Sequence, residues 1–180
     1  MSTKWNMSIP WVKKSDYIIR CTEEILAPNS NGNLMFTLKF EVQYPNTVED
    51  SAGEEMVVAG TPLTYWCVVQ SLTGSKNQSP EEATEACKGR YRKLREAFDL
   101  PNKDIDWDNP PGGFKGKLVY AQLDNEENVQ RGAPSKADLI AGKKEGPVLV
   151  NPKTKKPLIK YYPKIAEIFG TAELPSSNTL

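Results

Sequence analysis

The longest regular pattern of the chain is an alternation of apolar and polar side chains over residues 33–44. Apolar side chains occupy every second position of this stretch: Leu34, Phe36, Leu38, Phe40, Val42 and Tyr44. A period of two is typical of a β-strand with one buried and one solvent-facing side. At about 3.3 Å per residue the strand would span about 36 Å, about twice the usual length, which favours a strand that bends around a small barrel.

Four other segments have the composition of strands: residues 16–26, 61–70, 114–124 and 158–162. The turn sequence Ala-Pro-Asn-Ser-Asn-Gly predicts that the first of these strands returns antiparallel into the 33–44 strand. The 61–70 segment is apolar on both faces, which indicates a strand that is covered on both sides.

A helix is predicted over residues 79–99. Ser79 is a suitable N-cap, Pro80 suits the first helical position, and Glu82 completes a capping box. Its apolar stripe consists of Ala83, Cys87, Tyr91, Leu94 and Phe98, and its other side carries Lys88, Arg90, Arg92, Lys93 and Arg95. These cations are either a solvated face that offsets the helix dipole or contacts to phosphate groups. A short second helix is expected over 163–169.

The order of elements is three strands, a helix and two more strands. This order predicts a mainly β fold with one or two helices, a five-stranded OB-fold-like Greek-key barrel with the helix between strands 3 and 4. We expect an N-terminal arm over 1–14, one domain over 15–170 and a loose C-terminal tail over 171–180. Residues 125–157, rich in Gly, Pro, Lys and Asn, are expected to form a long flexible loop within the domain.

Composition narrows the chemistry. The chain has 23 Lys and Arg against 23 Asp and Glu, so any polyanion site must come from local clustering. Histidine is absent, and the three cysteines are far apart, so the sequence predicts no cofactor, no metal site and buried thiols in a reducing compartment. The start of the chain is unlike a signal peptide and no apolar run could span a bilayer, so we expect a cytoplasmic protein without membrane contact.

Four stretches together resemble a known family. They are Asn-Gly-Asn-Leu-Met-Phe-Thr-Leu-Lys-Phe-Glu-Val, Tyr-Arg-Lys-Leu-Arg-Glu-Ala-Phe-Asp-Leu, Phe-Lys-Gly-Lys-Leu-Val-Tyr-Ala-Gln-Leu and Pro-Leu-Ile-Lys-Tyr-Tyr-Pro-Lys-Ile. In order and spacing, over about residues 15–169, they look like phage-encoded OB-fold single-stranded-DNA-binding proteins of replication and recombination modules. Many such proteins end in an acidic tail that binds partners. This chain ends in Ala-Glu-Leu-Pro-Ser-Ser-Asn-Thr-Leu and departs from the family there.

The resemblance implies a non-enzymatic protein that binds single-stranded DNA in the host cytoplasm, with phage replication or recombination proteins as further partners. Phosphates would be neutralised by Lys39, Lys115, Lys117, Lys153, Lys155, Lys156 and Lys160, and bases would stack on Trp66, Tyr120 and Tyr161. Both Trp66 and Tyr120 could instead be core residues. The oligomeric state is left open.

Two other functions are compatible with the sequence. A phage structural or adaptor protein could use the same barrel for protein contacts, through an apolar footprint. A metal-dependent nuclease would need converging carboxylates, for which Asp104, Asp106 and Asp108 are the available set. Their alternation resembles a calcium loop, but position six is Asn109 and position twelve is Lys115, so the loop pattern fails.

Overall fold

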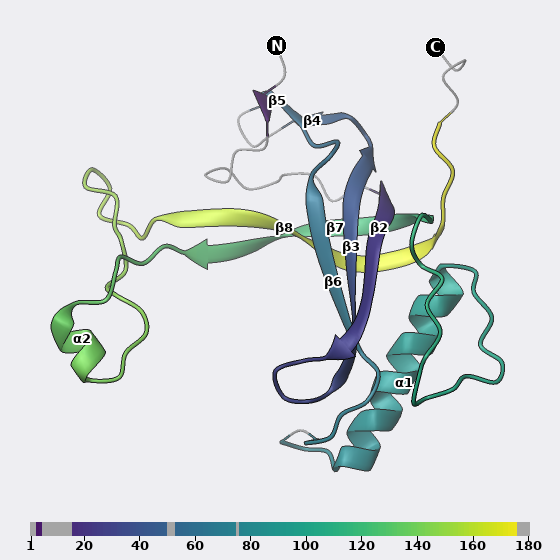
Figure 1. Cartoon of the computed structure of the whole chain (residues 1–180). Helices are drawn as coiled ribbons and strands as arrows, with labels where there is room; N and C mark the ends of the chain where they lie inside the picture. The colour runs from purple at the N-terminus through teal and green to yellow at the C-terminus, as the bar shows by residue number, and fades with distance from the viewer. Residues whose placement is uncertain (1–2, 5–15, 50–52, 75, 176–180) are drawn as a thin grey trace.

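The computed structural model describes residues 3–4, 16–49, 53–74 and 76–175, so most of the expected arm and the last five residues lie outside it. Its main element is a five-stranded antiparallel sheet with the strand order β6-β3-β2-β7-β8 (Figure 1). The strands are β2 (Asp16–Pro28), β3 (Leu34–Tyr44), β6 (Pro62–Val68), β7 (Leu118–Val129) and β8 (Ile159–Thr171). A small second sheet has the order β1-β5-β4, from Thr3–Lys4, Glu55–Val57 and Thr47–Glu49.

The alternation over 33–44 is confirmed as strand β3, which lies between β2 and β6. Its apolar side faces the core, where Phe36, Leu38, Phe40 and Val42 are buried, while Tyr44 at its end is exposed. The polar side chains of β3 lie on the opposite face of the sheet, where Lys39 and Glu41 are both exposed to solvent. The period of two therefore identified both the strand and its buried face.

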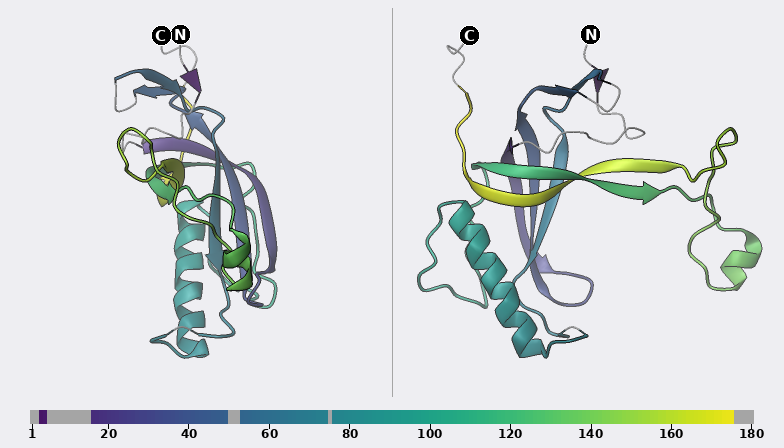
Figure 2. Two further views of the ribbon diagram at one scale, coloured as in Figure 1. Left: turned by 90° about the vertical axis from the view of Figure 1, so that its left-hand side faces the viewer. Right: turned by 180° about the vertical axis from the view of Figure 1, so that it is seen from behind.

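Helix α1 (Pro80–Ala97) covers the core face of the sheet (Figure 2). Ser79 is its N-cap, and the Ser79 hydroxyl accepts the N–H of Glu82 at 3.2 Å. The helix packs through aromatic contacts. The Tyr91 ring is stacked on Phe36, with 5.6 Å between centroids, and Phe98 meets Phe114 edge-on at 5.0 Å. This aromatic layer between α1 and β3 forms the centre of the core.

Arg95 departs from the predicted basic, solvated side of the helix, because its side chain is only 3% exposed. Its guanidinium donates to the carbonyl oxygens of Pro101, Pro111 and Gly112 at 2.8–2.9 Å. Arg95 therefore ties the loop that follows α1 back onto the helix, which is a structural use of a residue expected to face solvent.

The expected closed barrel is corrected by the structure, in which no ladder joins the edge strands β6 and β8 among the described residues. The two strands approach each other at the body. However, β6 has only seven residues, and β8 stays paired with β7 from Val119–Thr171 to Val129–Ile159. The distal halves of β7 and β8 therefore leave the body as a two-stranded ribbon (Figure 1).

Strand β8 also replaces the helix expected over 163–169. Ile165 and Ile168 are three residues apart, as on a helix face, and both pack against the core. They do so from a strand, because the register shifts by one residue between their partners Leu123 and Ala121. A β-bulge thus produces a spacing of three within a β-strand.

The predicted 125–157 loop is shorter and more regular than expected. Strand β7 continues to Val129, and the segment between β7 and β8 contains helix α2 (Lys136–Ile140). Isolated bridges join Arg131 to Val148 and Val150 to Pro157. Within the described span 130–158, which we call the ribbon tip, Gly146 is the only buried residue. The tip is therefore ordered by local hydrogen bonds rather than by a core of its own.

Candidate nucleic-acid interface

The outer face of the sheet, opposite α1, carries an exposed tryptophan on its edge strand β6. Trp66 of β6 pairs with Thr37 of β3, which pairs with Ile25 of β2, so the three side chains form one row across the strands. Trp66 is 63% exposed, and Ile25 is exposed as well. An indole held on a rigid sheet and open to solvent on one side can stack against a planar ring.

The rows on either side of Trp66 differ in polarity. One consists of Ala27, Met35 and Val68, and the other of Glu23, Lys39 and Thr64. The Lys39 ammonium lies 3.2 Å from the Glu23 carboxylate, and both side chains are about half exposed. An ion pair in solvent contributes at most about 1 kcal/mol, so Lys39 can exchange this partner for an external anion. We call these three rows, from β2, β3 and β6, the outer patch.

A second aromatic group lies on the same face nearer the start of β2. Ile18 is flanked by Tyr120 of β7 on one side and by Tyr44 of β3 on the other. Both tyrosines are exposed, and Tyr120 lines a shallow pocket with Asp16 and Phe169. Tyr120 is thus a surface residue, as the stacking hypothesis requires.

The two lysines expected on the fourth strand precede β7 and lie at the loop that Arg95 holds. The backbone N–H groups of Gly113 and Lys115 point to the Glu24 carboxylate at 3.2 and 3.4 Å, and the Lys115 side chain is exposed. The Lys117 ammonium lies 3.4 Å from the carbonyl oxygen of Phe98, the C-cap of α1. Lys117 therefore stabilises a helix C-terminus and is not directed toward the outer patch.

The remaining predicted residues belong to the ribbon. Lys153, Lys155 and Lys156 are exposed in the turn that ends it, where the Asn151 carboxamide oxygen accepts the N–H of Lys153 at 2.9 Å. On β7, Asn128 is the partner of Lys160, and the preceding residue, Glu127, is the partner of Tyr161. Neighbouring residues of a strand point to opposite faces, so Lys160 and Tyr161 do not share a surface.

The structure thus divides the ten predicted residues into groups. Lys39 and Trp66 are together on the outer patch, Tyr120 is on the same face of the sheet, and Lys153, Lys155 and Lys156 are together at the ribbon tip. Lys115 and Lys117 lie at the loop before β7, and Lys160 and Tyr161 lie on opposite faces of the ribbon.

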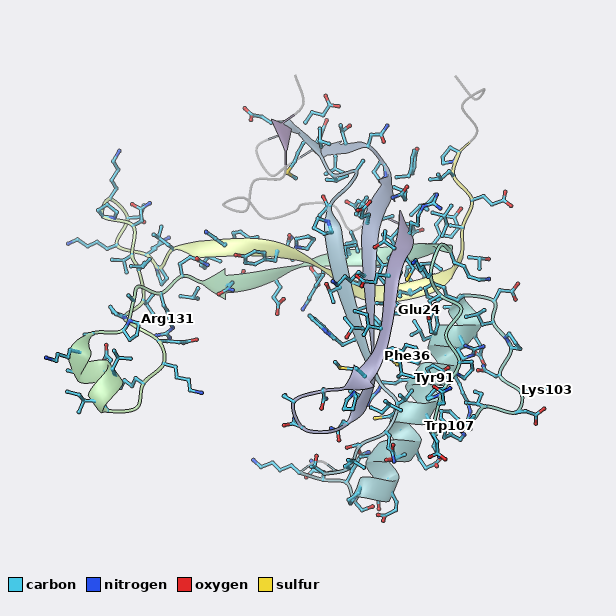
Figure 3. The ribbon with its side chains drawn as sticks, in the orientation of Figure 1. Glu24, Phe36, Tyr91, Lys103, Trp107 and Arg131 are labelled. Carbon is cyan, nitrogen blue, oxygen red and sulfur yellow. The ribbon has the colours of Figure 1, made fainter. Side chains whose placement is uncertain are left out.

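Sequence reasoning missed the segregation of charge. The ribbon tip contains seven Lys and Arg against two Asp and Glu, in a chain whose net charge is zero, so the rest of the chain is net negative. Figure 3 places Arg131 at the tip and Lys103 on the loop after α1, at opposite ends of the molecule. That loop carries Asp104, Asp106 and Asp108. Counting charge by segment would have revealed the segregation, but only the ribbon shows that it is also spatial.

The cations of α1 have a partner that the sequence did not indicate. The Lys88 ammonium and the Arg92 guanidinium lie 4.9 and 5.0 Å from the centroid of the Trp107 ring, which also meets Tyr91 edge-on. The part-buried Trp107 thus fixes the acidic loop to the helix (Figure 3). Of the two readings of the basic helix side, this contact favours a structural role for Lys88 and Arg92.

The ionisable core groups are arranged for stability. Burial raises the pKa of the Cys21 and Cys67 thiols from the usual 9.0 to about 11, so both stay protonated at neutral pH. Burial also raises the pKa of Tyr65 and Tyr91. Within the described residues, no three carboxylate or thiol side chains converge as a metal site would require. The Asp106 carboxylate instead accepts the N–H of Asp108 at 3.0 Å.

Comparison of the chain with protein-family models, curated proteins and solved structures finds no match. Neither helix in the described part of the chain has the length and apolar character needed to cross a membrane.

Proposed function

We propose that this chain is an OB-fold-like protein that binds single-stranded DNA without catalysis. The observation that carries the proposal is Trp66, which is 63% exposed in the middle row of the outer patch, on the edge strand β6. In the protein itself, the cross-strand pair of Trp66 with Thr37 contributes only about 0.2–1 kcal/mol, whereas stacking a base on the indole contributes about 1–3 kcal/mol. Along the chain, three strands of the sheet (β2, β3 and β6) precede α1 and two (β7 and β8) follow it. This is the order expected of an OB-fold.

The proposed mechanism separates stacking from charge neutralisation. Bases stack on Trp66 and, farther along the face, on Tyr120, while Lys39 neutralises a phosphate beside the tryptophan. The turn lysines Lys153, Lys155 and Lys156 contact phosphates beyond the sheet. The ring faces require unstacked bases, which a single strand offers and a duplex does not. None of these contacts needs a metal ion or a cofactor.

The biological setting of the proposal follows from the resemblance of the sequence motifs. We place the protein in phage replication or recombination, in the host cytoplasm, where it would cover single strands. An adaptor that used the outer patch for protein contacts would bind a partner with little dependence on salt. The two functions are therefore separated by the salt dependence of binding and by the identity of the ligand.

Replacement of Trp66 tests the proposal, with a labelled oligothymidylate and fluorescence anisotropy as the measurement. We expect Trp66→Ala to weaken binding by about 1–3 kcal/mol and Trp66→Phe to weaken it less, because a smaller ring still stacks. The salt dependence should be unchanged in both variants, since stacking releases no counterions. Thermal melting should also be unchanged, because the side chain lies outside the core.

Leu174→Glu, at an exposed residue that follows β8, is the matched control and should bind like the wild type. Equal affinity of Trp66→Ala and wild type would remove the outer patch from the binding site. Absence of any single-strand binding by the wild type at low salt would refute the proposed function, and the adaptor function would replace it.

A further inference from the structure

The α2 lobe, which we define as residues 131–147 of the ribbon tip, exposes apolar side chains that no described residue of the chain covers. Leu139 is 60% exposed and Ile140 is 82% exposed, and all five residues of α2 are at least partly exposed. Figure 1 shows the lobe at the end of the ribbon, held away from the body, on the opposite side of the ribbon from the turn at 151–156. Phosphate contacts by that turn therefore leave Leu139 and Ile140 unexplained.

The lobe keeps its shape through local polar contacts. The Ser135 hydroxyl accepts the N–H of Asp138, and the Asp138 carboxylate accepts the N–H of Ser135, both at 3.1 Å. Arg131 forms an ion pair with Glu145 at 3.3 Å and donates to the carbonyl oxygen of Gly146. A single helical turn is unstable in water unless it is buried. The hydrogen bonds of Ser135 and the ion pair of Arg131 therefore hold the lobe in a fixed shape, which lowers the entropy cost of binding a partner that would bury it. The adjacent side chains of Leu139 and Ile140 form an exposed apolar patch with lysines around it, and patches rimmed by polar residues mark interaction surfaces.

The body of the same protein has a groove of matching character at the start of α1. Leu72 is 56% exposed there and lies with Pro80 and Thr84 in a shallow groove of about 360 Å³, beside Glu81 and Glu85. Its shape is fixed, because the Thr84 hydroxyl donates to the carbonyl oxygen of Ser71 and accepts the N–H of the same residue. We call this the α1 groove.

The charges of the two surfaces are complementary. The lobe presents Lys136 and Lys144, for which the described residues show no ion pair, together with Lys143, which lies 4.0 Å from Asp138. The α1 groove is lined by Glu81, likewise without an ion pair among the described residues, and by Glu85, which contacts the lining residue Lys88 at 3.3 Å. Glu82, the next residue of α1 after Glu81, is exposed as well. The lobe, with four Lys and Arg against two Asp and Glu, is thus net positive, and the groove lining, with two Glu against one Lys, is net negative.

We propose that the partner of the α2 lobe is a second copy of this chain, with Ile140 of one copy seated in the α1 groove of the next. The lobe and the groove are different surfaces, so the contact is heterologous and leaves one lobe and one groove open at the ends. Copies therefore associate head to tail into open-ended chains. This association requires no nucleic acid and is independent of the proposed DNA binding.

Sedimentation velocity of the full chain without nucleic acid tests the inference over about a hundredfold range of concentration, at low and high salt. We expect the wild type to sediment faster as its concentration rises, more so at low salt. Ile140→Glu in the lobe and Leu72→Glu in the groove should each remain monomeric over the same range. Leu174→Glu, which adds the same charge at an exposed leucine outside both surfaces, should associate like the wild type.

Mixing the two defective variants gives the sharper test. Ile140→Glu retains an intact groove, and Leu72→Glu retains an intact lobe, so an equimolar mixture should form dimers and nothing larger. Circular dichroism melting should match the wild type for both variants, because neither side chain is in the core. A monomeric wild type at every concentration, or a mixture that stays monomeric, would overturn the inference. The inference would also be overturned if the wild type did not associate and Ile140→Glu lost affinity for an oligonucleotide, because the lobe would then be a nucleic-acid contact.

Discussion

At the scale of single residues, the structure changes the role of several charged side chains whose positions looked similar in the sequence. Arg92 and Arg95 are three residues apart on α1, yet Arg92 is exposed against Trp107 and Arg95 is buried against three carbonyl oxygens. Arg95 is buried because the chain folds back over it after Pro101. Five fixed donors suit several acceptors at once, which a lysine ammonium cannot match.

Replacement of Arg95 by lysine is therefore expected to be destabilising, by about 2–4 kcal/mol, because the side chain is buried and the three carbonyl oxygens of the loop lose their charged donors. Urea unfolding followed by circular dichroism measures the change. Arg92→Lys is the matched control and should cost less than about 1 kcal/mol, as expected for an exposed cation–π contact. A similar small cost for Arg95→Lys would show that the loop does not depend on the guanidinium.

The buried thiols predict how stability changes at high pH. The unfolded chain ionises its cysteines near pH 9, whereas the folded chain keeps Cys21 and Cys67 protonated up to a pKa of about 11. Stability is thus fully present below pH 9 and declines as the pH rises to 11, by about 2–3 kcal/mol per thiol. Melting temperatures between pH 7 and 11 measure the decline, and Cys67→Ala should make it shallower. An equally steep decline in that variant would assign it to other groups.

At the scale of elements, the ribbon differs in kind from the rest of the fold. The strands at the body and α1 share one core, whereas the ribbon tip between 130 and 158 buries only Gly146. Segments with little burial open locally at low cost in free energy. The same tip is net positive, with seven Lys and Arg against two Asp and Glu. Binding of a polyanion to these cations should therefore stabilise the tip against local opening.

Limited trypsin digestion tests this coupling. We expect the first cuts at the ribbon tip, at Lys143, Lys144 and the lysines of the 151–156 turn, because their backbone is exposed and locally unstable. Cuts in α1 should come much later. A short oligothymidylate at low protein concentration should slow the cuts in the turn. Unchanged cleavage of the turn with and without the oligonucleotide would separate it from DNA binding.

At the scale of the whole molecule, a chain of zero net charge is divided into a basic ribbon tip and a net negative body. A single strand should therefore contact phosphates mainly at the tip and at Lys39. The strand would pass over the outer patch, while α1 and its acidic loop lie on the other side of the sheet (Figure 2). The same division of charge favours contact between the tip of one copy and the body of another.

Salt dependence measures this distribution of contacts. Lys156→Ala should weaken binding and lower the slope of log affinity against log salt by about 0.7, the value for one phosphate contact on a single strand. Lys117→Ala should leave the slope unchanged, because its ammonium is directed to the C-cap of α1. Equal slope changes in the two variants would mean that the strand also follows the loop before β7.

The sequence by itself determined the elements whose signals are local. The alternation over 33–44 identified β3 and its buried face, and Ser79 and the apolar stripe identified α1, because strand and helix periods depend only on neighbouring residues. The tertiary structure decided what depends on distant partners. A bulge made Ile165 and Ile168 part of a strand, the barrel stayed open because no ladder joins β6 to β8 among the described residues, and folding of the loop buried Arg95 and engaged Lys117. Trp66 became a surface residue because β6 is covered on one face only, and no local pattern in 61–70 contains that information.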